Sequence, residues 1–282
     1  MAVARLENRH NLWHIPGFHS ENVPRESEPQ LMQVWPAIDL RNGHCVRLQQ
    51  GDYARETIFE ADPTAAATRL AEAGALRLHI VDLDGARDGR PTNQPIVESL
   101  VQASGLPCQV GGGIRDEDAI VRWLESGVSR VVIGTRGIRE PEWFRSMCRK
   151  YPNKLVLGID ARDGKLATDG WKTTEGRDAV DLALDLDDEP IAAFLFTDIA
   201  TDGMLQGPNL AATKTLCDKV RSPVLASGGV TTVDDVAQLK HAGAAGCIIG
   251  RAFYEGKIDL AEAVQVAADH AENVEPKERS PS

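Results

Sequence analysis

Short apolar runs recur along the chain, separated by longer stretches in which apolar and polar residues alternate at helical spacing. The runs are rich in Val, Ile and Leu, which strands favour, and each is apolar nearly throughout, as in parallel strands buried on both faces. They occupy residues 34–39, 77–83, 106–110, 130–134, 154–160, 192–198, 223–227 and 246–250. The pattern predicts eight strands.

The intervening stretches have the signature of amphipathic helices. Residues 116–127 and 233–243 carry apolar side chains at helical spacing and end on glycine, as helices commonly do. Eight alternating strand and helix units predict an α/β fold with a parallel sheet, and eight is the number of strands that closes a (β/α)8 TIM barrel.

An internal repeat divides the predicted barrel into two (β/α)4 half-barrels. A shift of 116 residues places GGGI at 111–114 on SGGV at 227–230, Gly134 on Gly250, and Asp82 on Asp198. A shift of 121 residues places Asp39 on Asp160. Half of a barrel has open sheet edges that only the other half can close, so we expect a single domain.

The two ends of the chain lack these patterns. We predict a poorly ordered N-terminal extension at residues 1–33, the barrel at 34–270 and a C-terminal tail at 271–282.

Charge and composition limit the partners. A formal charge of -11 argues against nucleic acid and anionic membranes, although backbone N–H groups can still bind a small anion. Five dispersed cysteines without a CxxC pair are typical of a reducing compartment, and neither a signal peptide nor a transmembrane run is evident. These features predict a cytoplasmic protein.

Aspartates follow four of the predicted strands, at the barrel end that carries function in this fold. They are Asp39, Asp82, Asp160 and Asp198. A lone Asp there is often a turn or cap residue. Because the repeat makes Asp39 and Asp160 equivalent, we expect these two to face each other across the mouth and to act as an acid/base pair.

Glycine-rich loops follow four other strands and form two neighbouring pairs. Glycine lets the backbone approach a ligand, and N–H groups at helix starts favour phosphate, although one such loop alone is often only a tight turn. Two pairs half a barrel apart predict a small substrate with a phosphate at each end. The candidate phosphate-binding residues are Gly112, Gly113, Gly134 and Thr135 in one pair, and Gly228, Gly229, Gly250 and Arg251 in the other.

Other chemistry is not indicated. No metal-ligand spacing occurs and neither GxGxxG nor GxxxxGK[ST] is present, so we expect no metal and no nucleotide cofactor. His79 is best interpreted as a packed strand residue, and His44 in RNGH as part of a hairpin turn after the first strand. Trp171 could cover a ligand or anchor its own loop.

The ordered motifs resemble one family over roughly residues 34–270. PAIDLRNGHCVRLQQGDY, HIVDLDGA, VGGGIR, RVVIGT, TDGW, FTDIATDGMLQGPN, ASGGV and IIGRAFYEGK are similar to those of the phosphoribosylformimino-5-aminoimidazole carboxamide ribotide isomerase family. The resemblance implies a cofactor-independent Amadori rearrangement in histidine biosynthesis. It also implies that Asp39 is the general base, Asp160 the general acid, and Thr197 and Asp202 assisting residues. Because internal barrel closure makes a monomer sufficient, we expect no obligatory protein partner.

Three alternatives differ from this interpretation. The cyclase subunit of imidazole glycerol phosphate synthase uses the same two aspartates but needs a glutaminase partner. HIVDLDGA, IATDGM and RLQQGDY look like the isomerase instead. A dual-substrate isomerase would also act on phosphoribosylanthranilate, and the loop residues Trp171 and Arg177 leave this open. A non-catalytic binding module would have no use for an acid/base pair.

Overall fold

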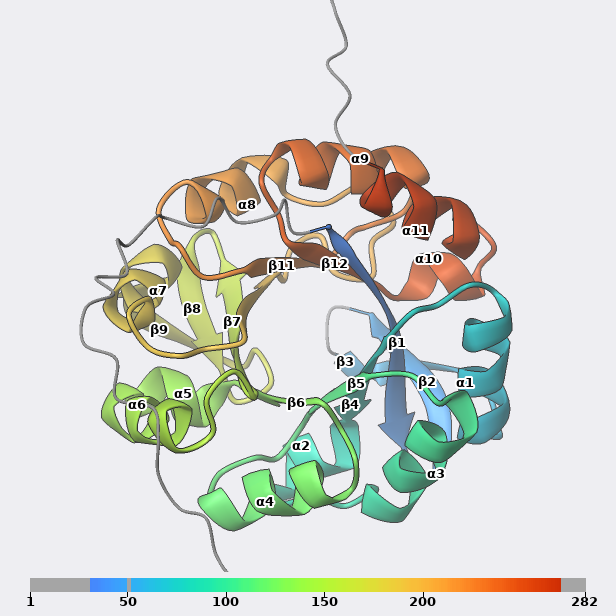
Figure 1. Cartoon of the computed structure of the whole chain (residues 1–282), viewed down its shortest axis with the longest axis horizontal. Helices are drawn as coiled ribbons and strands as arrows, with labels where there is room; N and C mark the ends of the chain where they lie inside the picture. Colours follow the sequence, from blue (N-terminus) through green and yellow to red (C-terminus); the bar gives the residue numbers. More distant parts are fainter. Residues whose placement is uncertain (1–30, 50–51, 270–282) are drawn as a thin grey trace, which may run out of the picture. The chain divides into compact units, whose positions relative to one another are not determined.

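A computed structural model describes residues 31–49 and 52–269, and eight parallel strands form the centre of this part of the molecule (Figure 1). Neighbouring strands follow the order β10-β11-β12-β1-β4-β5-β6-β7, and the pairing of β7 with β10 closes the ring. The strands are β1 (Gln33–Arg41), β4 (Leu78–Asp82), β5 (Cys108–Gly111), β6 (Arg130–Ile133), β7 (Leu155–Arg162), β10 (Ala193–Asp198), β11 (Val224–Ser227) and β12 (Gly246–Ile249). All eight predicted strands and the predicted (β/α)8 barrel are thereby confirmed.

Helices surround the strands on the outside of the ring (Figure 1). The predicted helical stretches at 116–127 and 233–243 contain α4 (Glu117–Glu125) and α9 (Val233–His241). The other helices are α1 (Pro63–Glu72), α2 (Leu83–Asp88), α3 (Gln94–Ser104), α5 (Thr135–Arg139), α6 (Pro141–Lys150), α7 (Ala179–Leu186), α8 (Leu210–Cys217), α10 (Arg251–Tyr254) and α11 (Leu260–Ala268). None of the described helices is long and apolar enough to cross a membrane.

The two faces of each barrel strand belong to two different cores. Successive side chains of a strand point to opposite faces. On β1, Val34, Ile38 and Leu40 belong to the large core shared with the helices, whereas Trp35 and Ala37 belong to a smaller core inside the barrel. The strands are therefore apolar on both faces, which explains why the sequence pattern showed continuous apolar runs.

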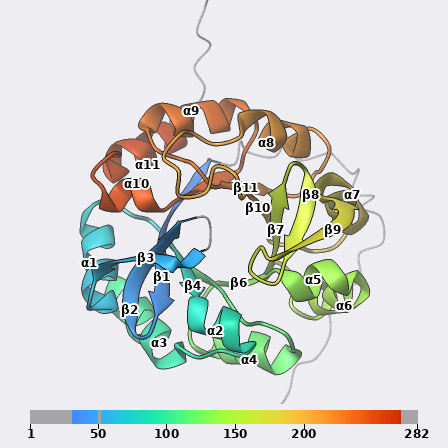
Figure 2. The ribbon, with the colours of Figure 1, turned by 180° about the vertical axis from the view of Figure 1, so that it is seen from behind.

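Four additional strands form antiparallel hairpins beyond the eight predicted strands. They are β2 (His44–Gln49), β3 (Asp52–Glu60), β8 (Lys165–Thr168) and β9 (Thr173–Asp178). The sequence analysis predicted the turn in RNGH but none of these strands. The β2–β3 pair continues from β1 through that turn, where φ is positive at Asn42 (49°) and Gly43 (80°), and the β8–β9 pair continues from β7. Figure 2 shows the two hairpins on opposite sides of the ring of strands.

The first barrel strand begins next to the predicted start of the barrel at residue 34. β1 begins at Gln33, whose N–H donates to the carbonyl of Ala245 at 2.9 Å, and Met32 is already buried in the outer core. The rest of the predicted N-terminal extension, residues 1–30, lies outside the described residues. The predicted C-terminal tail, residues 271–282, lies outside them as well.

Candidate active site

The side chains inside the barrel change from apolar to polar toward the carboxyl ends of the strands. On β1 the inward row runs Trp35, Ala37, Asp39, so Asp39 follows two residues of the inner core. The same alternation on β7 leads from Val156 of that core to Asp160. The alternation of side chains along β1 and β7 therefore places both candidate carboxylates inside the barrel at its mouth.

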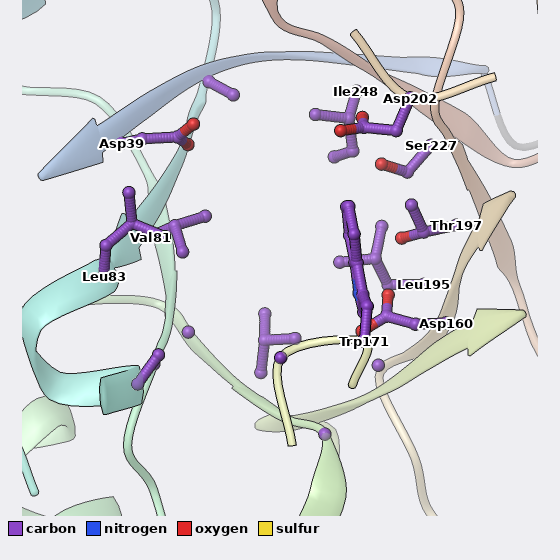
Figure 3. Close-up of a pocket in the computed structure, with 18 of the residues that line it drawn as sticks. Asp39, Val81, Leu83, Asp160, Trp171, Leu195, Thr197, Asp202, Ser227 and Ile248 are labelled. Carbon is purple, nitrogen blue, oxygen red and sulfur yellow. The ribbon is translucent and has the colours of Figure 1, made fainter. Parts of the chain in front are cut away.

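A cavity of about 560 Å³ opens at this end of the barrel. Asp39 projects into it from one side, and Asp160, Thr197 and Asp202 lie on the opposite side (Figure 3). The structure thus brings the predicted acid/base pair and all eight predicted phosphate-binding residues into one cavity. Its lining includes Asp39, Gly112, Gly113, Gly134, Thr135, Asp160, Thr197, Asp202, Gly228, Gly229, Gly250 and Arg251.

Asp39 is held by an arginine that the sequence analysis missed. Arg47 Nη1 lies 2.7 Å from Asp39 Oδ2, and the Arg47 guanidinium also donates to the carbonyl of Ala37. The centre of the Tyr254 ring lies 4.9 Å from Arg47 Cζ, and the Tyr254 hydroxyl donates to the same Ala37 carbonyl at 3.0 Å. This arrangement fixes a buried guanidinium beside the Asp39 carboxyl group.

Arg47 could have been found from the sequence by its position on the first hairpin. Asn-Gly is a strong hairpin signal, and a strand that follows it must run back along the strand that contains Asp39. Arg47 is the arginine of that returning strand, and its neighbour Val46 is the register partner of Asp39. A hairpin prediction extended to this strand would have placed Arg47 next to Asp39 in the strand pair, although strict alternation would have assigned its side chain to the opposite face.

Asp160 has a different environment from Asp39. Burial raises the pKa of Asp160, while hydrogen bonds from Trp171 and Thr197 act to lower it. Thr197 is the register partner of Asp160 on the adjacent strand β10, and Trp171 lies over Asp160 within the cavity (Figure 3). The net effect favours the protonated, proton-donating form of this carboxyl.

Trp171 comes from the tip of the β8–β9 hairpin. Asp169, Gly170 and Trp171 all have positive φ, at 56°, 65° and 69°. Arg139 of α5 pairs with Asp169 at 2.7 Å, and the Asp169 N–H donates to Thr135 Oγ1 at 3.1 Å. These contacts hold the strained turn against α5, so that Trp171 both lines the cavity and belongs to a fixed loop.

Asp202 lies in the loop that follows β10. Burial and the negative charges of Asp39 and Asp160 raise the pKa of Asp202 to about 7, although Arg47 acts to lower it. Arg251 Nη1 donates to the carbonyl of the next residue, Gly203, at 2.7 Å. Arg251 therefore anchors the loop of Asp202, in addition to lining the cavity.

In one loop of each predicted phosphate-binding pair, the glycines have little room for a side chain. A Cβ on Gly113 would lie 2.2 Å from the carbonyl oxygen of Gly85, and one on Gly229 would lie 2.2 Å from that of Gly207. Both glycines also have positive φ, at 70° and 86°. Only glycine therefore allows these loops their close backbone approach.

The other loop of each pair starts a short helix at a glycine. Gly134 precedes α5 and Gly250 precedes α10, with similar backbone angles of φ -97°, ψ -108° and φ -102°, ψ -110°. Among the described residues, no atom outside the glycine and its chain neighbours lies within 4 Å of a Cβ built on Gly134, and the nearest to one on Gly250 lies 3.9 Å away in Arg47. Here the backbone faces open space in the cavity.

Further arginines line the cavity in this acidic protein. Arg115, Arg136 and Arg139 accompany Arg47 and Arg251. The GGGIR motif contains Arg115, so the residue was visible in the sequence, but its direction into the cavity depends on the loop fold. Among the described residues, five acidic side chains line the same cavity, so the arginines supply charged donors for an anionic ligand without giving the cavity an excess of positive charge.

His79 lines the same cavity as the candidate catalytic aspartates and does not belong to the outer core. It is buried, and desolvation lowers its pKa to about 4. Its Nδ1 lies 3.0 Å from Nε2 of Gln109, and an amide nitrogen can only donate, so His79 accepts there. The imidazole is therefore neutral near pH 7 and presents an N–H from Nε2.

Two of the four strand-end aspartates do not reach the cavity. Asp82 and Asp198 are buried and accept hydrogen bonds from their own loops. These two are therefore the turn or cap residues that an aspartate at a strand end often is: Asp82 caps α2, and Asp198 holds the turn that follows β10. Within residues 31–49 and 52–269, no group of three or more His, Cys, Asp or Glu residues is placed to hold a metal ion.

Comparison with known proteins gives long, well-covered matches. A protein from Rhodopirellula baltica is 50% identical over 246 residues, covering 86% of this chain and 97% of its own length. One from Halorhodospira halophila is 50% identical over 241 residues (84% and 98%), and one from Rhodospirillum rubrum is 47% identical over 241 residues (84% and 100%). All three are named 1-(5-phosphoribosyl)-5-((5-phosphoribosylamino)methylideneamino) imidazole-4-carboxamide isomerase.

The family model described as "Histidine biosynthesis protein" matches residues 33–259, which include every barrel strand and every candidate site residue. The chain therefore belongs to the histidine biosynthesis protein family.

Proposed function

We propose that this protein is the histidine-biosynthesis isomerase that converts the bisphosphorylated aminoaldose named in its relatives to the corresponding aminoketose. The observation that carries the proposal is the contrast between two carboxyls in one cavity. Asp39 is paired with Arg47, whereas burial raises the pKa of Asp160. Such a contrast supports different acid and base roles for chemically identical side chains.

Asp160 is proposed as the general acid that opens the ribose ring. Its carboxyl proton passes to the ring oxygen as the bond between that oxygen and C1 breaks. The lone pair of the substituent nitrogen forms the C1=N bond of an iminium. Trp171 and Thr197, which hydrogen-bond to Asp160, orient the carboxyl for this transfer.

Asp39 is proposed as the general base that moves the next proton. It takes the proton from C2, and the electron pair of that bond forms an enolamine as the positive charge on nitrogen is neutralised. The enolamine then gains a proton at C1 and loses one from the C2 hydroxyl, which gives the ketose. Electrons are redistributed only within the substrate, so the scheme balances without an external oxidant or reductant.

Asp202 is proposed to assist at this second stage. With a pKa raised to about 7, it holds a proton in part of the molecules at neutral pH and lies where the charge of Asp39 influences it. A group of this kind can exchange a proton with the substrate hydroxyl during tautomerisation.

The two glycine cradles are proposed to bind the two substrate phosphates. Gly112, Gly113, Gly134 and Thr135 form one, and Gly228, Gly229, Gly250 and Arg251 the other. Backbone N–H groups and the nearby arginines supply donors, and fixing both ends holds C1 and C2 between the carboxyls.

The test is turnover of the purified full chain with the bisphosphate aminoaldose, without added nucleotide. Formation of the aminoketose is the expected result. Two parallel reactions separate the alternatives: phosphoribosylanthranilate tests the dual-substrate activity, and the aminoketose with ammonia tests the cyclase activity. Binding of the aminoaldose without any turnover would contradict the proposal and favour the binding module.

A further inference from the structure

Asp82 is a buried carboxylate that organises the loop behind the first glycine cradle. It is fully buried and accepts from the N–H of Gly85 at 2.8 Å and from that of Thr92 at 2.7 Å. Asn93 donates twice, from its backbone N–H at 3.1 Å and from Nδ2 at 2.7 Å. A buried carboxylate needs hydrogen-bond donors of this kind, so Asn93 fixes the orientation of the Asp82 side chain and the position of its loop.

Asp198 has the same relation to Asn209, 116 residues further along the chain in both cases. Asn209 Nδ2 donates to Asp198 Oδ2 at 2.6 Å, and the Ala200 N–H donates to Oδ1 at 2.8 Å. Asn209 also caps α8, since its Oδ1 accepts from the Ala212 N–H at 3.0 Å. We call Asp82 with Asn93 the first latch, and Asp198 with Asn209 the second latch.

Each latch lies directly under one glycine cradle. A Cβ on Gly112 would be 2.1 Å from the carbonyl oxygen of Asp82, and one on Gly228 would be 2.6 Å from that of Asp198. The cradle backbone thus rests on the backbone of the latched aspartate. A shift of that aspartate must displace the glycine N–H groups above it.

The latch asparagines do not themselves reach the ligand. Neither Asn93 nor Asn209 lines the cavity, and Asn93 is buried. In the first latch, Asn93 Nδ2 also lies 3.0 Å from Asp84 Oδ2, which accepts from the Asn42 N–H at 2.7 Å. This contact extends the first latch to the turn between β1 and β2.

We propose that Asn93 and Asn209 are positioning residues, each of which holds one phosphate cradle in its binding geometry through the aspartate that it latches. The proposal rests on the proposed function, because it assumes that the two cradles take the two phosphates. Affinity for phosphate depends on several N–H groups pointing at the same oxygens, so a small displacement of the loop weakens binding while leaving Asp39 and Asp160 in place.

The experiment compares Asn93→Ala and Asn209→Ala in the full-length protein. Each is expected to raise KM for the bisphosphate aminoaldose about tenfold or more, with kcat within about threefold of wild type, because binding is lost and the acid/base pair is not. Inorganic phosphate can still occupy the intact cradle of each single variant, so its inhibition constant is expected to rise by this factor only in the double variant. The double variant should show the product of the two effects, since the latches share no partner.

Matched variants separate positioning from general damage. Gln94 neighbours Asn93, but its side chain donates to Glu98 at 2.9 Å, so Gln94→Ala should leave KM unchanged. Asn93→Ser and Asn209→Ser keep a small donor and should fold even if the alanine variants do not, with KM between wild type and alanine. Loss of folded protein alone would lower apparent kcat at unchanged KM.

The outcomes are distinct. Folded single variants with wild-type KM, or a folded double variant with wild-type inhibition by phosphate, would overturn the positioning role, as would a fall in kcat alone. If wild type does not isomerise the aminoaldose, the proposed function fails. In that case, titration of the wild type and the double variant with inorganic phosphate would still show whether the latches affect the affinity for phosphate.

Discussion

Asp202→Asn tests whether the third carboxyl of the cavity is held in a proton-binding environment. Burial and the charges of Asp39 and Asp160 raise the Asp202 pKa from 3.8 to about 7. Asparagine has nearly the same shape and no titratable proton. The variant therefore removes the unfavourable ionisation while keeping most of the packing.

The sign of the effect follows from proton binding. With a higher pKa in the folded state, Asp202 keeps its proton in the folded protein while the unfolded chain has already lost it. The wild type thus loses stability as pH rises from about 4 to about 7, and the loss is complete above the folded pKa. The asparagine variant has no such loss, so its stability relative to wild type increases as pH increases.

The size of the change follows from the pKa difference. About three units at 1.36 kcal/mol each give at most about 4 kcal/mol at pH 8.5, and about 1.5 kcal/mol at pH 5, where the loss is incomplete. The difference in unfolding free energy between variant and wild type should therefore grow by about 2.5 kcal/mol between these pH values.

Urea unfolding at pH 5 and pH 8.5 measures this growth. Contacts that asparagine gains or loses change the unfolding free energy by the same amount at both pH values. Only the change of that free energy with pH therefore tests the argument. Asp163→Asn, an exposed carboxylate in the turn between β7 and β8, is the control and should show no comparable growth. A pH-independent difference for Asp202→Asn would refute the reasoning.

Three further changes test the rest of the site. Trp171→Phe removes a hydrogen bond that lowers the Asp160 pKa, so the high-pH limb of kcat should move to higher pH in a pH-rate profile; an unmoved or lowered limb would contradict this. Arg47→Met removes the partner of the base and should reduce kcat/KM by about 100-fold or more, which steady-state kinetics would measure. A reduction below tenfold would argue against that role. Gly113→Ala should destabilise the fold by about 2 kcal/mol more than Gly105→Ala in urea unfolding, because both glycines have positive φ but only Gly113 lacks room for a Cβ; equal losses would refute the packing argument.

The sequence was sufficient for the barrel because its strands are buried on both faces. Continuous apolar runs marked all eight, and the residue after each run marked the mouth, which is how Asp39 and Asp160 were found. The strands of the hairpins β2–β3 and β8–β9 were missed because they project beyond the barrel, where polar residues interrupt the apolar pattern.

The sequence could not predict in which direction these side chains point or which hydrogen-bond partners they have, for a physical reason. Asp82 and Asp39 both follow apolar runs, yet one caps its own loop and the other faces the cavity, and the donors from Gly85, Thr92 and Asn93 decide the difference. Likewise the sequence predicted an acid/base pair at Asp39 and Asp160, but the burial that raises the pKa of Asp160 arises only when distant strands close the barrel.

The measurement that tests the central claim most directly is the rate of aminoaldose isomerisation by Asp39→Asn and Asp160→Asn, with the dissociation constant of the aminoketose determined for each. The account predicts that both variants bind the aminoketose within about tenfold of wild type while kcat falls by about 1,000-fold or more. Turnover by either variant within tenfold of wild type would contradict the assignment of these two carboxyls as the acid/base pair.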